Sequence, residues 1–317
     1  MKNTLQDLNV FMSDKQSGIL DALTNDNPML AAIPVKPATH GIYNVYAATT
    51  SIDELGEVDF DAALPAVGVS FELNQANLAK VGGTLPMPQD AANLMGGYNT
   101  YANDRIPKII AKAGNAHEAR LYYKGFMKYA LDNKNAVSAG GQTPNKQFSM
   151  VAVHFDSDSV TGLYNPTVDG DGKLELFQML ALNGGTEHKL AALNGAIGKE
   201  IALYMHYGLQ LADPRYVKAI VNIEPKENAT DRDKIDGMPT GMMIDDLIND
   251  VQGNPGNTVI FCNPIIRRYL GLKYNLEKRV VTDAAGKVAY DIYSWSDITF
   301  VTSHNIYKGT ESVIDIA

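Results

Sequence analysis

Residues 115–133 read NAHEARLYYKGFMKYALDN and carry the clearest helix signal in the chain. Their apolar side chains recur at the spacing of a single helix face: Ala119, Tyr122, Tyr123, Phe126, Met127, Ala130 and Leu131. Asn115 and Glu118 have the spacing of a helix start, where two side chains cap each other's backbone. The stretch therefore predicts a long amphipathic helix that begins at Asn115.

A second face of this helix is basic. Arg120, Lys124 and Lys128 repeat at every fourth position, and we call these three residues the basic stripe. Residues 104–134 hold seven basic and three acidic side chains. Such a run either faces water or meets an acidic partner, and the residues alone leave both readings open.

An acidic segment lies upstream. Residues 43–78 alternate apolar with small or polar side chains, which predicts two strands joined as a long hairpin. No lysine or arginine occurs between Pro37 and Ala79. The connection between the strands carries five carboxylates, which we call the acidic tip: Asp53, Glu54, Glu57, Asp59 and Asp61.

The first 38 residues are predicted to form an N-terminal arm. Apolar residues from Leu5 to Leu23 recur at roughly helical spacing, with Thr4 and Asp7 as a start signal, and predict one or two helices. Residues 33–37 read IPVKP and must be extended, because each proline fixes its own φ and restricts its predecessor. We expect this arm to pack poorly against its own chain and to lie on a neighbour.

Downstream of the long helix the signals are mixed. Residues 138–172 are predicted to be loops around one strand at 150–153, and residues 189–211 a helix interrupted by glycines. Residues 240–251 predict a short helix, and residues 258–262 a strand that leads into a helix capped by Asn263. A hairpin turning at 283–286 and strands at 298–301 and 313–316 complete an α+β region with an antiparallel sheet.

Composition limits the function classes. The 317 residues are 45% hydrophobic and 20% charged, as in ordinary globular proteins. A net charge of -9 argues against a protein that binds nucleic acid by neutralising phosphates over its surface. The single cysteine, Cys262, lies in an apolar run and is expected to be buried and inert. We find no signal peptide and no apolar run that could span a bilayer, so we expect a soluble cytoplasmic protein.

No motif predicts catalysis, a cofactor or a metal site. Residues 195–199 lack the spacing of a phosphate-binding loop, and residues 169–172 lack the ligands of a calcium loop. The six histidines are dispersed. A cytoplasmic enzyme of unknown class would explain the size of the chain and nothing else.

Three local stretches carry a resemblance: TGLYNP at 161–166, NTVIFCNP at 257–264 and YSWSDI at 293–298. With the order of the elements, they resemble the major capsid proteins of tailed bacteriophages, which have the Hong Kong 97-type fold shared with encapsulins. The resemblance implies an α+β chain with an N-terminal arm (1–38), an extended hairpin loop (39–88) and a peripheral domain with a spine helix (89–185). An axial domain (186–303) and a C-terminal strand that returns to the peripheral domain (304–317) follow.

The resemblance also implies the function. Such a subunit assembles into hexamers and pentamers of an icosahedral head around double-stranded DNA, which it contacts only non-specifically, and catalyses no reaction. Decoration, portal and separate scaffolding proteins are the implied partners, since the arm is too short for a fused scaffolding segment. An encapsulin-like cargo shell is the alternative within this class. The implied location is the virion capsid, assembled in the host bacterial cytoplasm without a membrane, and we expect the acidic tip to lie on a neighbour's basic stripe.

Overall fold

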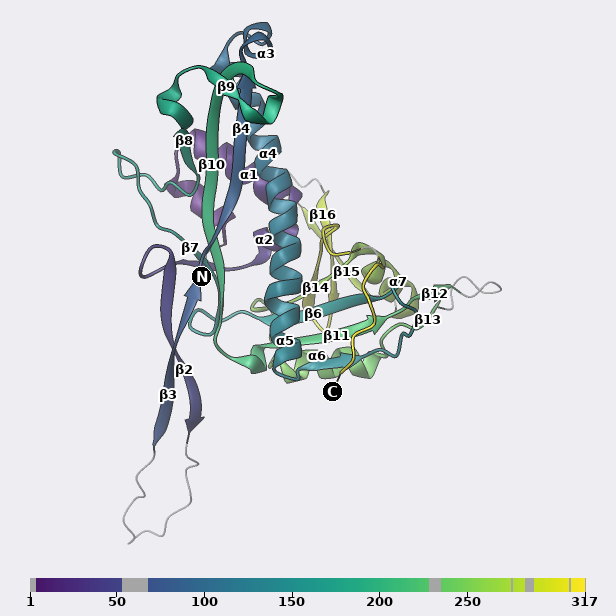
Figure 1. Cartoon of the computed structure of the whole chain (residues 1–317). Helices are drawn as coiled ribbons and strands as arrows, with labels where there is room; N and C mark the ends of the chain where they lie inside the picture. Colours follow the sequence, from purple (N-terminus) through teal and green to yellow (C-terminus); the bar gives the residue numbers. More distant parts are fainter. Residues whose placement is uncertain are drawn as a thin grey trace.

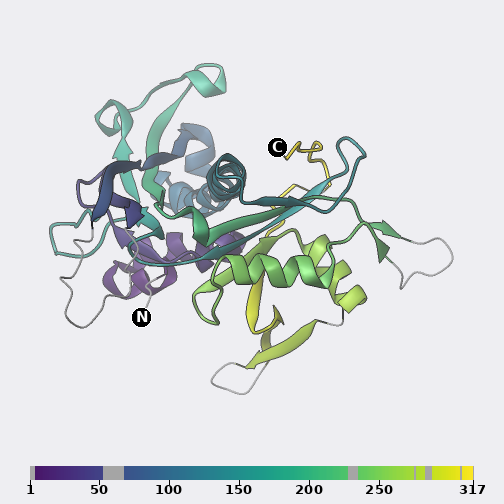
Figure 2. The ribbon, with the colours of Figure 1, turned by 90° about the horizontal axis from the view of Figure 1, so that it is seen from below.

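The computed structural model describes residues 4–52, 68–227, 235–274, 276–282, 288–307 and 309–316. A six-stranded and a seven-stranded sheet lie on opposite sides of a long central helix (Figure 1). The elongated part holds the six-stranded sheet, and the compact part holds the seven-stranded sheet. Seen from below, the helix is viewed end on between the two parts (Figure 2). No helix in the described ranges is long and apolar enough to cross a membrane.

The central helix is longer than its sequence signal. It consists of α4 (Tyr98–Arg120), a π-helical segment (Leu121–Met127) and α5 (Lys128–Asp132). The prediction of a start at Asn115 was wrong, because Asn115 and Glu118 lie inside α4. Glu118 is fully buried and binds groups far away in the sequence, so its spacing from Asn115 does not mark a cap. Pro107 also lies inside this helix.

The predicted apolar stripe is confirmed as the buried side of the helix. Tyr122, Phe126, Met127 and Ala130 are buried, while Tyr123 is half-buried. Phe126 stacks on Phe261 with 5.8 Å between ring centroids. The helix thereby anchors to the seven-stranded sheet from its π-helical segment.

The N-terminal segment corrects our expectation of a poorly packed arm. It forms a 3-10 turn (Gln6–Phe11), α1 (Asp14–Asp26), α2 (Pro28–Ala32) and β1 (Val35–Pro37). Leu20, Leu30 and Ile33 are completely buried in the larger core, and β1 pairs in parallel with β7 (Val160–Tyr164). The segment 33–37 is extended as predicted. Because pairing in a sheet lets alternate residues face a core built by other elements, it needs no amphipathic face of its own.

The six-stranded sheet is built around β10 (Ala196–Leu211), where the sequence predicted an interrupted helix. That prediction was wrong. Leu203, Met205 and Tyr207 are buried at alternate positions, which is the period of a strand. Its partners are β7, β4 (Ala79–Pro88), β8 (Gln178–Ala181) and β9 (His188–Leu190). A side chain at Gly198 would come within 2.1 Å of the Met87 carbonyl oxygen, so this glycine reports a close backbone approach.

The predicted hairpin is confirmed by β2 (Tyr43–Ile52) and β3 (Val69–Asn77), which pair antiparallel. It projects away from the rest of the chain at the bottom of Figure 1. The acidic tip (Asp53, Glu54, Glu57, Asp59, Asp61) lies outside the described residues.

The seven-stranded sheet is mixed, which corrects the antiparallel prediction. Its order is β15-β16-β17-β14-β6-β11-β5, and the β14–β17 and β11–β5 pairs are parallel. Its strands are β5 (Ala136–Ser138), β6 (Phe148–His154), β11 (Val217–Ile223), β14 (Thr258–Cys262), β15 (Glu277–Thr282), β16 (Val288–Trp295) and β17 (Ile298–Thr302). Residues 138–172 thus contribute β6 and β7, not one strand among loops. The turn at 283–286 lies outside the described residues.

Two helices cover this sheet, and each begins with a side-chain cap, of which the one at Asn263 was predicted. The Thr240 hydroxyl accepts a hydrogen bond from the Met243 backbone at the start of α6 (Gly241–Asp250). The Asn263 side chain accepts one from the Ile265 backbone at the start of α7 (Pro264–Tyr274). Ile244, Leu247, Ile248, Ile266 and Leu270 fill the second core.

Shorter elements connect these parts: α3 (Gln89–Leu94), 3-10 turns at Leu182–Gly185, Ala191–Leu193 and Pro214–Tyr216, and a small ladder of β12 (Lys226–Glu227) with β13 (Ile235–Asp236). The strand predicted at 313–316 is absent from the described residues 309–316. This segment instead makes single contacts, among them a pair of hydrogen bonds between the Ile314 backbone and the Asn222 side chain.

Candidate inter-subunit surfaces

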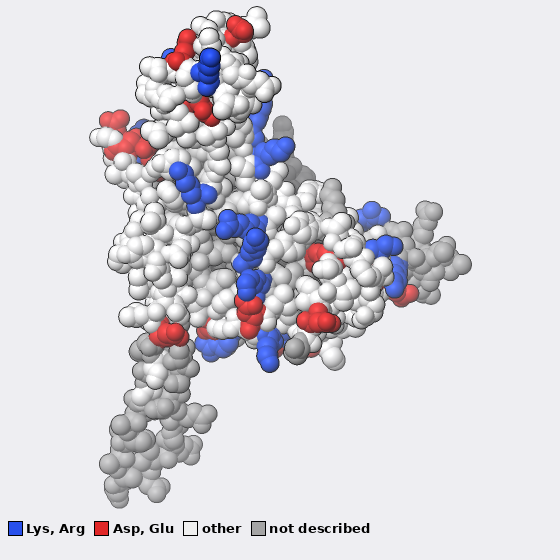
Figure 3. All heavy atoms as spheres, in the orientation of Figure 1, with Lys and Arg blue, Asp and Glu red and all other residues white. Residues whose placement is uncertain are grey.

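The basic stripe lies on the outside of the central helix. Arg120, Lys124 and Lys128 are all exposed, and blue side chains follow the helix in Figure 3. Lys128 pairs with Asp132 one turn further on, and the described residues show no ion pair for Arg120 or Lys124. Two of the three charges are therefore open to an external partner.

The hairpin carries exposed apolar side chains. At its base the Asn44 amide donates to the Gln210 side chain at 2.6 Å, and the Tyr46 hydroxyl donates to the Leu211 carbonyl at 3.3 Å. Further along, Leu73 is 76% exposed. A two-stranded hairpin is at best marginally stable alone in water. This hairpin would therefore be stabilised if a partner covered its exposed apolar side chains.

A buried carboxylate fixes the middle of the helix. Glu118 accepts hydrogen bonds from the Met29 backbone at 2.6 Å, from the Ser303 hydroxyl at 2.5 Å and from the Asn305 amide. Burial raises the pKa of this carboxyl. The network ties α2, α4 and the segment after β17 together. Sequence reasoning missed it, because its members lie 89 to 187 positions apart in the chain.

A second buried carboxylate holds the π-helical segment. Glu311 accepts hydrogen bonds from the Tyr123 hydroxyl at 2.6 Å and from the Ser149 hydroxyl at 2.9 Å. The Tyr123 hydroxyl in turn accepts one from the Tyr307 backbone. Burial raises the pKa of Glu311 to about 7. The C-terminal segment thus clamps the helix next to Lys124, which fixes the basic stripe relative to the seven-stranded sheet.

The remaining candidate positions do not form a binding site. Gly198 and Lys199 belong to β10, and Asp169 accepts backbone hydrogen bonds within its own turn. Cys262 is fully buried, as predicted, and burial raises the pKa of its thiol to about 12. Within the described ranges, no group of three side chains could hold a metal ion.

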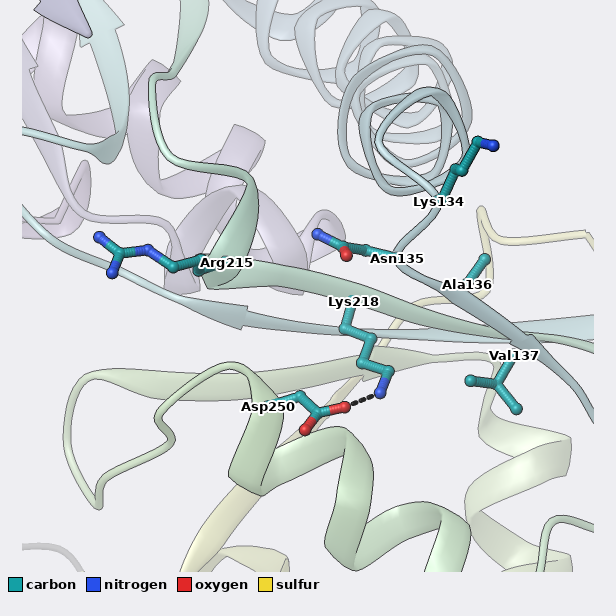
Figure 4. A pocket seen from close by; sticks show the side chains of 7 residues that line it. All are labelled: Lys134, Asn135, Ala136, Val137, Arg215, Lys218 and Asp250. Atoms are coloured by element: carbon teal, nitrogen blue, oxygen red, sulfur yellow. Dashed lines mark hydrogen bonds and ion pairs between the residues drawn. The ribbon is translucent and has the colours of Figure 1, made fainter. Parts of the chain in front are cut away.

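A pocket of about 260 Å³ lies beneath the end of the central helix (Figure 4). Its charged side chains do not point to a common centre. Lys134 and Arg215 point away from each other, and Lys218 is engaged in an ion pair with Asp250. The side chains that line this pocket therefore do not converge on a common point.

Comparison with known proteins gives the family. The family model described as major capsid protein GP7 matches residues 118–314, more than half of the chain. The chain belongs to this capsid protein family. The matched range includes the end of α4, the π-helical segment and all seven strands of the seven-stranded sheet.

Solved structures agree on the fold of this capsid protein. The capsid of bacteriophage JBD30 matches with a TM-score of 0.53 and 8% identity, covering 90% of this chain and 93% of the other. Bacteriophage Epsilon15 matches with a TM-score of 0.51 and 14% identity, covering 89% and 88%. A search of curated proteins found no match. The α+β, Hong Kong 97-type fold and the structural capsid role expected from the sequence are thereby confirmed.

Proposed function

We propose that this capsid protein forms the hexamers and pentamers of an icosahedral phage head that encloses double-stranded DNA and that it turns over no substrate. The family match over residues 118–314 carries the proposal. A net charge of -9 favours only non-specific contact with the packaged DNA. Portal, decoration and separate scaffolding proteins are the proposed partners, and assembly is proposed to occur in the host bacterial cytoplasm.

We propose an assignment of the parts of the capsid fold to segments of the chain. The expected bounds are 39–88 for the extended loop, 89–185 for the peripheral domain with the spine helix and 186–303 for the axial domain. The pairing of β10 with β4 and β7 favours an axial domain that begins after Leu211, because β10 completes the sheet of the elongated part. Residues 304–317 return to the spine helix through Tyr307 and Glu311.

We propose that the acidic tip of one subunit lies on or near the basic stripe of the next. The tip carries five carboxylates without a nearby cation in the sequence, and they repel one another unless an external cation compensates. Arg120 and Lys124 are exposed and unpaired among the described residues. Each exposed pair contributes at most ~1 kcal/mol, but a shell repeats the contact many times.

A charge swap tests this contact. Changing Glu54, Glu57 and Asp59 to lysine should block assembly of purified subunits, as measured by light scattering and electron microscopy. Combining this variant with Arg120→Glu, Lys124→Glu and Lys128→Glu should partly restore assembly. The matched control changes Lys146 and Lys189, two exposed lysines away from the stripe, to glutamate and should assemble normally. Full assembly by the tip variant alone would show that its charges face water.

A further inference from the structure

A groove runs along the elongated part, between β4 and α4. Its volume is about 810 Å³, and its floor is apolar, with Leu85 and Pro86 on one wall and Ile109, Ala113 and Ala116 on the other. The small side chains at 113 and 116 leave room above the helix for a bulky apolar group. Apolar surface of this kind is typical of contact sites.

The rim of the groove is basic. Arg105, Lys108 and Lys112 follow one another along the same side of α4. Asp104 pairs with Arg105 at 3.4 Å and with Lys108 at 2.8 Å. Lys112 has no ion pair among the described residues, so the rim keeps a net positive charge. The occupant of this groove should therefore be apolar at its centre and acidic around it.

A surface of that composition lies on the same chain. Val10 is 84% exposed and Phe11 is 62% exposed, and we call these two residues the apolar knob. Their backbone is fixed, because the Leu174 N–H donates to the Phe11 carbonyl at 2.8 Å and Met12 next to it is buried. Because the backbone of the knob is already held in place, it loses little conformational entropy when the side chains enter a pocket.

The surroundings of the knob are acidic. Its own segment, the first two turns of α1 and the hydrogen-bonded loop at 165–177 contribute more carboxylates than ammonium groups. The carboxylates are Asp7, Asp14, Asp21, Asp169, Asp171 and Glu175, against Lys15 and Lys173. Red side chains gather at the left edge of the molecule in Figure 3, where the segment after β7 lies in Figure 1.

The knob and the groove lie on different sides of α4. The N-terminal helices pack on the α4 side that holds Ile106 and Gly114, where Leu23 and Asn27 approach most closely. The groove lies on the side of Ile109 and Ala116. One chain therefore cannot fill its own groove with its own knob. Two complementary, non-identical surfaces on one subunit give head-to-tail contacts, which form a ring when the rotation from one subunit to the next closes.

We propose that the apolar knob of one subunit inserts into the β4–α4 groove of the next, with its acidic surroundings against Arg105, Lys108 and Lys112. The occupant is a second copy of this chain, because the knob is apolar like the floor of the groove and its surroundings are opposite in charge to the rim. This inference rests on the proposed shell assembly and adds a contact separate from the one between the acidic tip and the basic stripe.

Cysteine cross-linking tests the contact in assembled particles. Phe11→Cys and Ala116→Cys are combined and treated with a short bis-maleimide, while the buried Cys262 stays protected. We expect a ladder of covalent multimers on a denaturing gel. The matched control combines Ala116→Cys with Met242→Cys, a 69% exposed position on α6, and should give no ladder. Particles that form without a ladder above this control would overturn the inference, whereas wild-type protein that forms no particles would overturn the shell assembly itself.

A charge-reversal cycle keeps the inference testable if the cysteine variant does not assemble. Asp14→Lys and Lys112→Glu should each raise the threshold concentration for assembly about threefold to tenfold, since each removes one attractive pair and adds a repulsive one. The double variant should return toward the wild-type threshold. Lys189→Glu serves as the control and should leave the threshold unchanged. Additive effects of the two substitutions would contradict a direct contact between these surfaces.

Discussion

Phe126 is completely buried under the central helix, against Phe261 and Phe155 at 5.8 and 6.2 Å between centroids. Phe126→Ala should lower the free energy of unfolding by roughly 3 to 5 kcal/mol, because the substitution would leave a cavity in the core between the helix and the sheet. Urea unfolding of unassembled subunits measures this loss. Lys124→Ala, on the exposed face, should change it by no more than about 0.5 kcal/mol. Equal effects of the two substitutions would contradict the assigned faces of the helix.

The Glu311 clamp should make stability depend on pH. Its pKa is about 7 in the folded protein and near its ordinary value of 4.5 in the unfolded chain. Between these values the folded protein binds the proton more strongly, so the stabilisation from this group falls as pH rises from about 4.5 to 7. The loss is of order 3 kcal/mol.

Comparing wild type with Glu311→Gln isolates this effect. His117, whose pKa burial lowers to about 4, acts in the opposite direction but is common to both proteins. The variant should therefore gain stability relative to wild type as pH rises from 5 to 8, as measured by urea unfolding at each pH. A difference that stays constant over this range would show that Glu311 does not hold its proton in the folded protein.

At the scale of elements, two neighbouring glycines of β4 offer a matched pair. A side chain at Gly82 would come within 2.0 Å of the Leu203 carbonyl oxygen, whereas one at Gly83 meets nothing within 4 Å. Gly82→Ala should separate β4 from β10 and reduce the soluble yield sharply. Gly83→Ala should be neutral or stabilising by up to about 1 kcal/mol. Thermal unfolding of both variants measures the contrast, and similar melting temperatures would contradict the β4–β10 register.

Elements with local signals could be predicted from the sequence, and those with distant partners could not. The cap at Asn263 and the apolar stripe from Tyr122 to Ala130 depend on residues within a few positions of one another. In β10, by contrast, the sequence predicted a helix interrupted by glycines such as Gly198. The real reason for this glycine is the close approach of the β4 backbone, which lies more than 100 positions away in the chain and leaves no local signal. Burial of the N-terminal segment was missed for the same reason.

The candidate surfaces likewise divide into those that the sequence could predict and those that it could not. The basic stripe could be predicted because its period belongs to one helix, and the structure places all three of its residues on the exposed face. The Glu118 and Glu311 networks that hold this helix in place join three separate parts of the chain each, so no sequence pattern marks them. The β4–α4 groove likewise exists only once β4 lies beside the helix.

At the scale of the whole molecule, salt should weaken assembly. The proposed contacts join side chains of opposite charge, and at 1 M salt the screening length falls to about 3 Å. Light scattering of purified subunits should therefore give a threshold concentration for assembly that rises between 0.05 and about 1 M sodium chloride. The tip variant with Glu54, Glu57 and Asp59 changed to lysine should lose most of this dependence. A threshold independent of salt in the wild type would assign assembly to apolar contacts alone.

The most direct measurement is electron cryo-microscopy of the purified chain under assembling conditions. Because the chain belongs to a major capsid protein family and has the corresponding fold, it should form closed shells that contain both pentamers and hexamers. In their density the β2–β3 hairpin should cross onto the central helix of the adjacent subunit. A chain that stays monomeric at every concentration and salt, with or without candidate scaffolding protein, would contradict a shell-forming subunit.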